Sequence, residues 1–161
     1  MPTESRDANF NQLIRQLFHE EDWQKRAEAA RRIGLLKDNR ASNMLWRAIK
    51  SEKEYMVINR IIEAMGKIGD PKFTLSILDI LKEELKKREI DKFRITYILE
   101  SLSAIKDKRA LPYIGTFLTS SDEELKKLAQ DTFDAIEPNW REIIKEEKRE
   151  KTIEEIFKIN K

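Results

Sequence analysis

The amino-acid sequence predicts an all-α fold, an α-α superhelix in which short helix pairs stack side by side. Apolar residues recur with helical spacing, and Gly and Pro number only four each, fewer than the turns of a β-rich domain need. Charged residues make up 39% of the chain and mix Lys with Glu, as on exposed helix faces. The same apolar pattern also returns at intervals of 31, 32 and 37 residues, which indicates a repeat.

Each repeat is counted from an aspartate, and the four starts are Asp7, Asp38, Asp70 and Asp107. Apolar residues stand three, seven, ten and eleven positions after each start. They form one stripe of an amphipathic helix, with the aspartate at or near its N-cap. A fifth start at Pro138 has a shifted stripe, which is typical of a terminal capping repeat.

A second helix is expected in each gap between these stripes, so that one repeat consists of a helix, a turn and a helix. Ser51–Glu54 and Ser121–Glu124 have the pattern of capping boxes that open two of these second helices. About five extra residues between Lys82 and Asp91 predict a longer helix or loop at the surface.

The whole chain, residues 1–161, is predicted to be a single domain. We expect about four helix pairs over residues 7–145, with terminal capping helices, and a charged C-terminal extension over 146–161. A Thr152–Glu155 capping box would open a short helix in that extension. We expect this helix to dock on its own chain as a lid, and an arm that grips another subunit is the alternative. The array is expected to begin and end within the chain.

Two segments carry a family resemblance. Ala27–Asp38 and Ile62–Pro71 each run from an alanine-containing helix through glycine to aspartate, and they resemble the short HEAT-like repeat of phycobilin lyases. Ser101–Asp107 keeps the apolar positions and the aspartate but lacks both glycines. The resemblance covers roughly residues 7–145 and implies the α-α superhelix. It implies little about function, since such repeats serve many unrelated roles.

The sequence offers little for catalysis. There is no cysteine, and His19 is the only histidine, so a thiolate site, a histidine pair or a His-rich metal site is excluded within one chain. We interpret His19 as a solvated turn residue. Paired acids such as Glu83-Glu84 are interpreted as solvated faces, because no apolar pocket is evident to shift a pKa. We therefore expect no enzyme, no catalytic residues, no metal and no cofactor.

The net charge and the N-terminal sequence indicate which partners and which cellular location to expect. Thirty-two Lys and Arg nearly balance thirty Asp and Glu, which gives no overall reason to expect nucleic acid or a membrane surface. The N-terminus has no apolar segment, and no later run is long enough to span a membrane. Together with the absence of cysteine, this predicts a cytoplasmic protein.

A partner surface is predicted on the helices that follow each aspartate, which we expect to line the concave face. Trp46 with Leu75 and Leu78 could form an apolar patch with a basic rim, because Trp and Arg are frequent in interface hot spots. Packing of Trp46 and Leu78 between repeats is the interpretation we favour. The candidate binding residues are Asn43, Trp46, Arg47, Lys50, Leu75, Leu78 and Lys82.

Three further aromatic residues are assigned to packing. Trp23 and Tyr55 occupy the same repeat position, so we expect both to pack between repeats, and Trp140 to cap the core. The function predicted by elimination is a non-enzymatic protein-protein interaction module, an adaptor or regulatory subunit that binds another protein as a monomer or weak homo-oligomer. The alternatives are an accessory subunit of a modifying enzyme such as a lyase, and a weak nucleic-acid binder.

Overall fold

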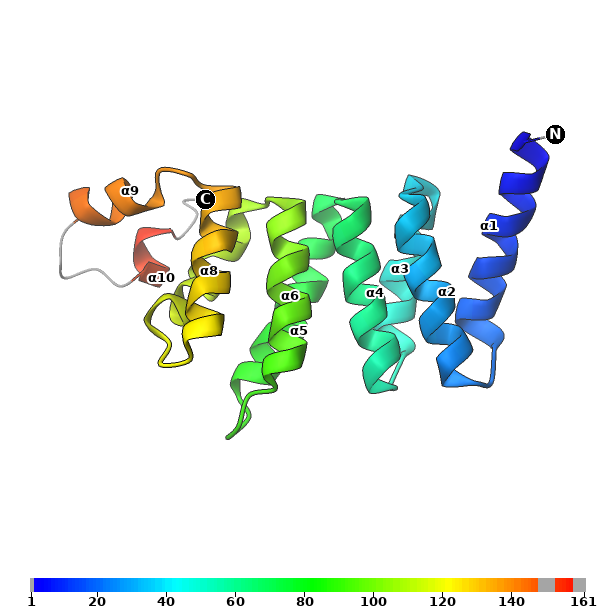
Figure 1. Cartoon of the computed structure of the whole chain (residues 1–161), viewed down its shortest axis with the longest axis horizontal. Helices are drawn as coiled ribbons and strands as arrows, with labels where there is room; N and C mark the ends of the chain where they lie inside the picture. Colours follow the sequence, from blue (N-terminus) through cyan, green and yellow to red (C-terminus); the bar gives the residue numbers. More distant parts are fainter. Residues whose placement is uncertain (1, 148–152, 158–161) are drawn as a thin grey trace.

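The computed structural model describes residues 2–147 and 153–157, and within them the chain is helical, without a strand. Figure 1 shows the helices as two rows. The inner row, in front, consists of α1 (Pro2–His19), α2 (Trp23–Leu36), α4 (Tyr55–Ile68), α6 (Lys92–Ile105) and α8 (Glu123–Ile136). The outer row consists of α3 (Ser42–Ser51), α5 (Thr74–Leu85), and α7 (Leu111–Ile114) continued by a 3-10 helix, η4 (Gly115–Thr119). The predicted all-α superhelix is confirmed.

The predicted repeat starts are confirmed at three of the four aspartates. Asp38, Asp70 and Asp107 each accept a hydrogen bond from the backbone N–H two residues on, at 2.9, 3.0 and 3.0 Å. Each opens a short 3-10 turn before the outer helix: η1 (Asn39–Ala41), η2 (Pro71–Phe73) and η3 (Lys108–Ala110). Asp7 instead lies inside α1, where its carboxylate pairs with Arg40 at 3.1 Å.

The two predicted capping boxes are placed differently. Ser51 is the last residue of α3, and the next inner helix begins only at Tyr55. The prediction at Ser51 is therefore wrong. Asp122, one residue after the predicted Ser121, caps α8 by accepting from two backbone N–H groups.

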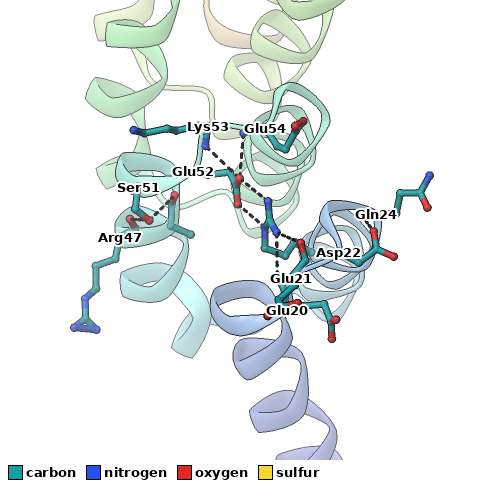
Figure 2. A network of polar contacts seen from close by, with 11 residues as sticks. Glu20, Glu21, Asp22, Gln24, Arg47, Ser51, Glu52, Lys53 and Glu54 are labelled. Carbon is teal, nitrogen blue, oxygen red and sulfur yellow. Dashed lines mark hydrogen bonds and ion pairs between the residues drawn. The ribbon is translucent and has the colours of Figure 1, made fainter.

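The turn before α4 is built instead around Glu52, which joins two repeats. Its carboxylate accepts from Arg26 Nε and Nη2 at 3.0 and 3.1 Å, and from the backbone N–H groups of Lys53 and Glu54. Arg26 also donates to the carbonyl oxygens of Glu20 and Glu21. Figure 2 shows Glu52 facing the turn that carries these two residues. The α1–α2 and α3–α4 turns are thus tied together.

The inner helices approach one another closely because two glycines stand where they touch. A Cβ added to Gly34 would lie 2.8 Å from Ala64 Cα, and one added to Gly66 would lie 2.8 Å from Ser101 Cα. Helices α2, α4, α6 and α8 therefore pack one on the next, whereas α3 packs on α4 and α5 on α6. An array with one closely spaced row bends toward that row. We infer from this spacing that the inner row lines the concave face, which differs from the expectation that the helices after each aspartate line it.

The extra residues of the third repeat form a loop between α5 and α6 rather than a longer helix. Glu84, only 3% exposed, ties this loop down by accepting from Asp91 N at 2.7 Å and Lys87 Nζ at 2.8 Å. The interpretation of Glu83-Glu84 as a solvated pair is therefore wrong for Glu84. Its neighbour Glu83 is exposed.

The C-terminal end of the array is closed by α9 (Trp140–Glu146) and α10 (Ile153–Ile156). Trp140 is 7% exposed and packs on Phe133 with ring centroids 5.3 Å apart, so its predicted capping role is confirmed. Helix α10 packs on α7 and η4, and Phe157 contacts Phe133 edge-on at 5.3 Å. The lid predicted for the C-terminal helix is thus confirmed for residues 153–157. Thr152, the start of its predicted capping box, lies outside the described residues.

Candidate protein-binding groove on the inner face

The seven predicted binding residues all lie on α3 and α5 of the outer row. Leu78 is 2% exposed and belongs to the core, because it faces the inner row rather than solvent. Its favoured interpretation, packing, is confirmed. The other six are exposed: Asn43, Trp46, Arg47, Lys50, Leu75 and Lys82.

Trp46 lies at the surface, with 38% of the residue exposed, rather than between repeats as we had favoured. Lys50 covers one face of its ring, with Nζ 3.2 Å from the centroid. Other members of the predicted set are engaged elsewhere: Asn43 accepts from Lys72 Nζ at 2.5 Å, and Lys82 Nζ lies 4.9 Å from the Tyr113 ring. The predicted patch is thus reduced to Trp46 and Leu75 on the convex side.

Trp23 and Tyr55 are the first residues of α2 and α4, and each is 39% exposed. Inter-repeat packing is confirmed for Tyr55, because Arg94 of α6 stacks over its ring at 4.7 Å and donates to its carbonyl at 3.3 Å. Arg94 itself is 8% exposed, and its Nε has no hydrogen-bond partner among the described residues. Burial lowers the pKa of this guanidinium against the raising effect of Tyr55 and nearby acids.

A groove of about 450 Å³ runs between α4 and α6 on the inner face, and we call it the α4/α6 groove. Its walls mix opposite charges with one aromatic ring, and its floor is made of small residues. The residues that line it are Lys37, Glu63, Gly66, Lys67, Ile68, Gly69, Tyr97, Glu100, Ser101 and Ala104.

An aromatic pair extends this groove along α6. Phe93 lies one turn before Tyr97, and the two rings meet edge-on with centroids 5.5 Å apart. Phe93 is 56% exposed, the most exposed aromatic residue in the described chain. Neither residue is among the predicted binding residues, which all lie on the helices after each aspartate. The four-residue spacing of Phe93 and Tyr97, away from the apolar stripe of the same helix, was the available signal.

Charges on the inner face are partly neutralised by neighbours. Glu28 pairs with Arg31 at 2.6 Å and Glu63 with Arg60 at 3.0 Å. The hydrogen bond from Arg31, aided by other nearby arginines, lowers the pKa of Glu28. In contrast, Lys67 and Glu100 in the α4/α6 groove make no ion pair with any described residue, so both remain available to a ligand.

His19 is exposed at the end of α1, as expected. Over residues 2–147 and 153–157, no group of three or more His, Asp or Glu is arranged to hold a metal ion. No helix in these ranges is both long and apolar enough to cross a membrane.

Comparison with known proteins supports the repeat architecture. A family profile described as HEAT repeats matches residues 10–89. A comparison with curated proteins finds no match. Among solved structures, the complex of CpcE and CpcF of phycocyanin lyase from Nostoc sp. PCC7120 is similar, with a TM-score of 0.71 and 19% identity. That match covers 86% of this chain and 57% of the other, so the chain spans little more than half of that protein's length.

Proposed function

Because this chain is a HEAT-like repeat protein, we propose that it is a non-enzymatic protein-interaction module that binds a segment of a partner protein in the α4/α6 groove. The observation that carries the proposal is the exposed Phe93–Tyr97 pair beside a groove on the concave face. Concave faces of helical repeat arrays are extended binding surfaces, and aromatic residues supply much of the energy at protein interfaces.

The chemistry of the groove fits a peptide segment better than a small apolar ligand. Lys67 and Glu100 can each form an ion pair with a partner, one with an acid and one with a base. The rings of Phe93 and Tyr97 offer apolar area next to these charges. Such an arrangement places an apolar anchor inside a polar rim, as protein interfaces do. A role as an adaptor or regulatory subunit follows from this binding.

Phe93→Ala and Leu75→Ala form a matched pair of variants, because the two residues are 56% and 58% exposed on opposite rows. Tagged wild-type and variant proteins are used to capture partners from the native organism, and mass spectrometry identifies what binds. We expect Phe93→Ala to lose the main partner while Leu75→Ala keeps it, with circular dichroism and melting temperature unchanged in both. Loss of the partner only with Leu75→Ala would place binding on the outer row and contradict the proposal.

The structural likeness to a lyase complex favours one second candidate, an accessory subunit of a modifying enzyme. This candidate shares the protein-binding step and differs in the identity of the partner. It predicts that the protein captured by the wild type, but not by Phe93→Ala, is an enzyme whose activity rises when this chain is added. A captured partner without such activity supports the adaptor.

A further inference from the structure

A second opening lies at the N-terminal end of the inner row, between α1 and the C-terminal half of α2. Two adjoining hollows, of about 720 and 180 Å³, share Leu35 and Leu36 as a common wall. Figure 1 shows α1 leaning away from α2 toward its N-terminal end. We call this opening the terminal groove; its lining residues on α1 and α2 are separate from those of the α4/α6 groove except for Lys37.

The terminal groove exposes apolar surface that later repeats do not. Leu36 is 44% exposed, whereas Ile105 and Ile136, at the corresponding positions of α6 and α8, are 7% and 6% exposed. Leu35 is 55% exposed and stands where α4 has Lys67. Two adjacent leucines are therefore left in water. The matching positions hold Lys67 and the half-buried Ile68 in α4, and an alanine followed by a buried isoleucine in α6 and α8. Exposed apolar surface concentrated in this way is typical of an interaction site.

The rim of the terminal groove is basic. Its acids, Asp7 and Asp38, both pair with Arg40, at 3.1 and 2.7 Å. Arg32 and Lys37 make no ion pair with any residue that the structure describes. The five basic residues of the lining, against two acids, are Arg6, Arg31, Arg32, Lys37 and Arg40. This local excess is larger than the net charge of +2 on the whole chain.

We propose that the terminal groove binds an acidic amphipathic helix from a partner protein. An amphipathic helix lays its apolar face into an apolar groove, and Leu35 and Leu36 would receive that face. Acidic residues flanking the apolar face would meet Arg32 and Lys37, so charge complementarity selects the partner and its orientation. A nucleic acid would use the basic rim but leave both leucines in water, so it fits the site less well.

The test is a selection from a displayed library of random peptides against the full-length protein. We expect the enriched peptides to repeat apolar residues every three or four positions and to carry Asp or Glu beside them. The best peptide is then titrated by fluorescence anisotropy. Leu35→Lys places in α2 the residue that α4 has at this position, so the helix should stay intact. We expect this substitution to raise Kd by about tenfold or more, the loss of affinity typical of an interface hot spot.

Leu75→Lys is the matched control, because it makes the same substitution at a residue that is 58% exposed on the outer row. It should leave Kd unchanged, as should Phe93→Ala, which separates this proposal from the α4/α6 groove. Arg32→Glu is a second variant, which tests the charge contribution. It should weaken binding of the same peptide. Enriched peptides without acidic residues, or a Kd that Leu35→Lys does not change, would overturn the proposal. So would binding of an oligothymidine that depends on Arg32 but not on Leu35.

Discussion

The inner and outer rows are packed by different means. Where inner helices meet, the contacts are small: Gly34 faces Ala64, and Gly66 faces Ser101. The outer row instead buries large side chains, such as Phe73 at the end of η2 and Ile77 of α5, both fully buried. Successive inner helices approach one another closely, whereas α3 and α5 of the outer row make few mutual contacts, so the array curves toward the inner row. The size of a few contact residues thus decides which face a partner meets as a concave surface.

The largest effect is expected in the outer row, where Phe73→Ala removes a side chain that is 0% exposed. The truncation leaves a cavity under α5 and should lower the free energy of unfolding by about 3–5 kcal/mol. Denaturant unfolding measures this difference. A loss below about 1 kcal/mol, near the typical point mutation, would mean that large residues do not anchor the outer row.

The inner row is tested by Gly66→Ala. In an exposed helix this substitution stabilises by about 1 kcal/mol. Here the new Cβ would lie 2.8 Å from Ser101 Cα, a backbone atom that moves only with its helix. We therefore expect a net loss of about 1–3 kcal/mol, measured by denaturant unfolding. A gain in stability would break the comparison, because close spacing would then not depend on this glycine.

The tie between successive turns is tested through Glu52. Burial alone would raise the pKa of its carboxyl, but hydrogen bonds from Arg26 and from backbone N–H groups outweigh burial and lower that pKa. Because the pKa of Glu52 is lower in the folded state, its carboxylate stabilises the fold at pH values above the pKa of the unfolded chain, about 4.3. This stabilisation is lost as the pH falls through the pKa of the folded state. Glu52→Gln should therefore cost about 1–3 kcal/mol at neutral pH, and the difference from wild type should shrink in acid.

Glu28→Gln is the matched control for Glu52. The pKa of Glu28 is lowered too, first by the hydrogen bond from Arg31, but its side chain is 52% exposed. Solvent screening should keep this variant within about 0.5 kcal/mol of wild type. Unfolding by denaturant at several pH values measures both variants. If they lose equal free energy of unfolding, burial of the Arg26–Glu52 pair adds nothing to stability.

Apart from the control variant, the smallest effect is expected where inner helices end. Gly69 ends α4 with φ +77°, whereas Lys106 ends α6 in the same left-handed conformation with φ +61°. A side chain strains this conformation, while glycine adopts it freely at some entropic cost in the unfolded state. Lys106→Gly should therefore raise the free energy of unfolding by about 0.5–1 kcal/mol. Thermal melting measures it, and a lower melting temperature would contradict this account.

The register was predictable because its residues act locally. Asp38, Asp70 and Asp107 mark the starts of the outer helices, because each side chain accepts a hydrogen bond from the backbone N–H two residues later. The N-cap of α8 was also predicted to within one residue, since Asp122 rather than Ser121 caps this helix. Periodicity also identified the buried stripes, since burial repeats with the helical turn.

The concave face could not be predicted in this way, because curvature depends on distances between helices far apart in the sequence. Gly66 lies inside α4 against Ser101 of α6, a contact that no local pattern in the sequence indicates. The burial of Glu84 was missed for the same reason, since its partners lie in a loop whose path the pattern does not specify. Phe93 and Tyr97 were not predicted as binding residues because the binding surface was expected on the outer row. Their four-residue spacing on α6 was nevertheless visible in the sequence.

Gly115 of η4 touches Ile153 of α10, and even one added carbon would collide with that side chain. This contact has a consequence for growth of the protein by duplication. A further unit appended after α8 would have to displace α10 from the end of the array. A duplicate of residues 38–69 placed between existing repeats would leave that end untouched and lengthen the inner face by one helix. Insertion of a repeat in the interior would therefore leave the contact between Gly115 and Ile153 unchanged, whereas a unit packed on η4 would have to replace it.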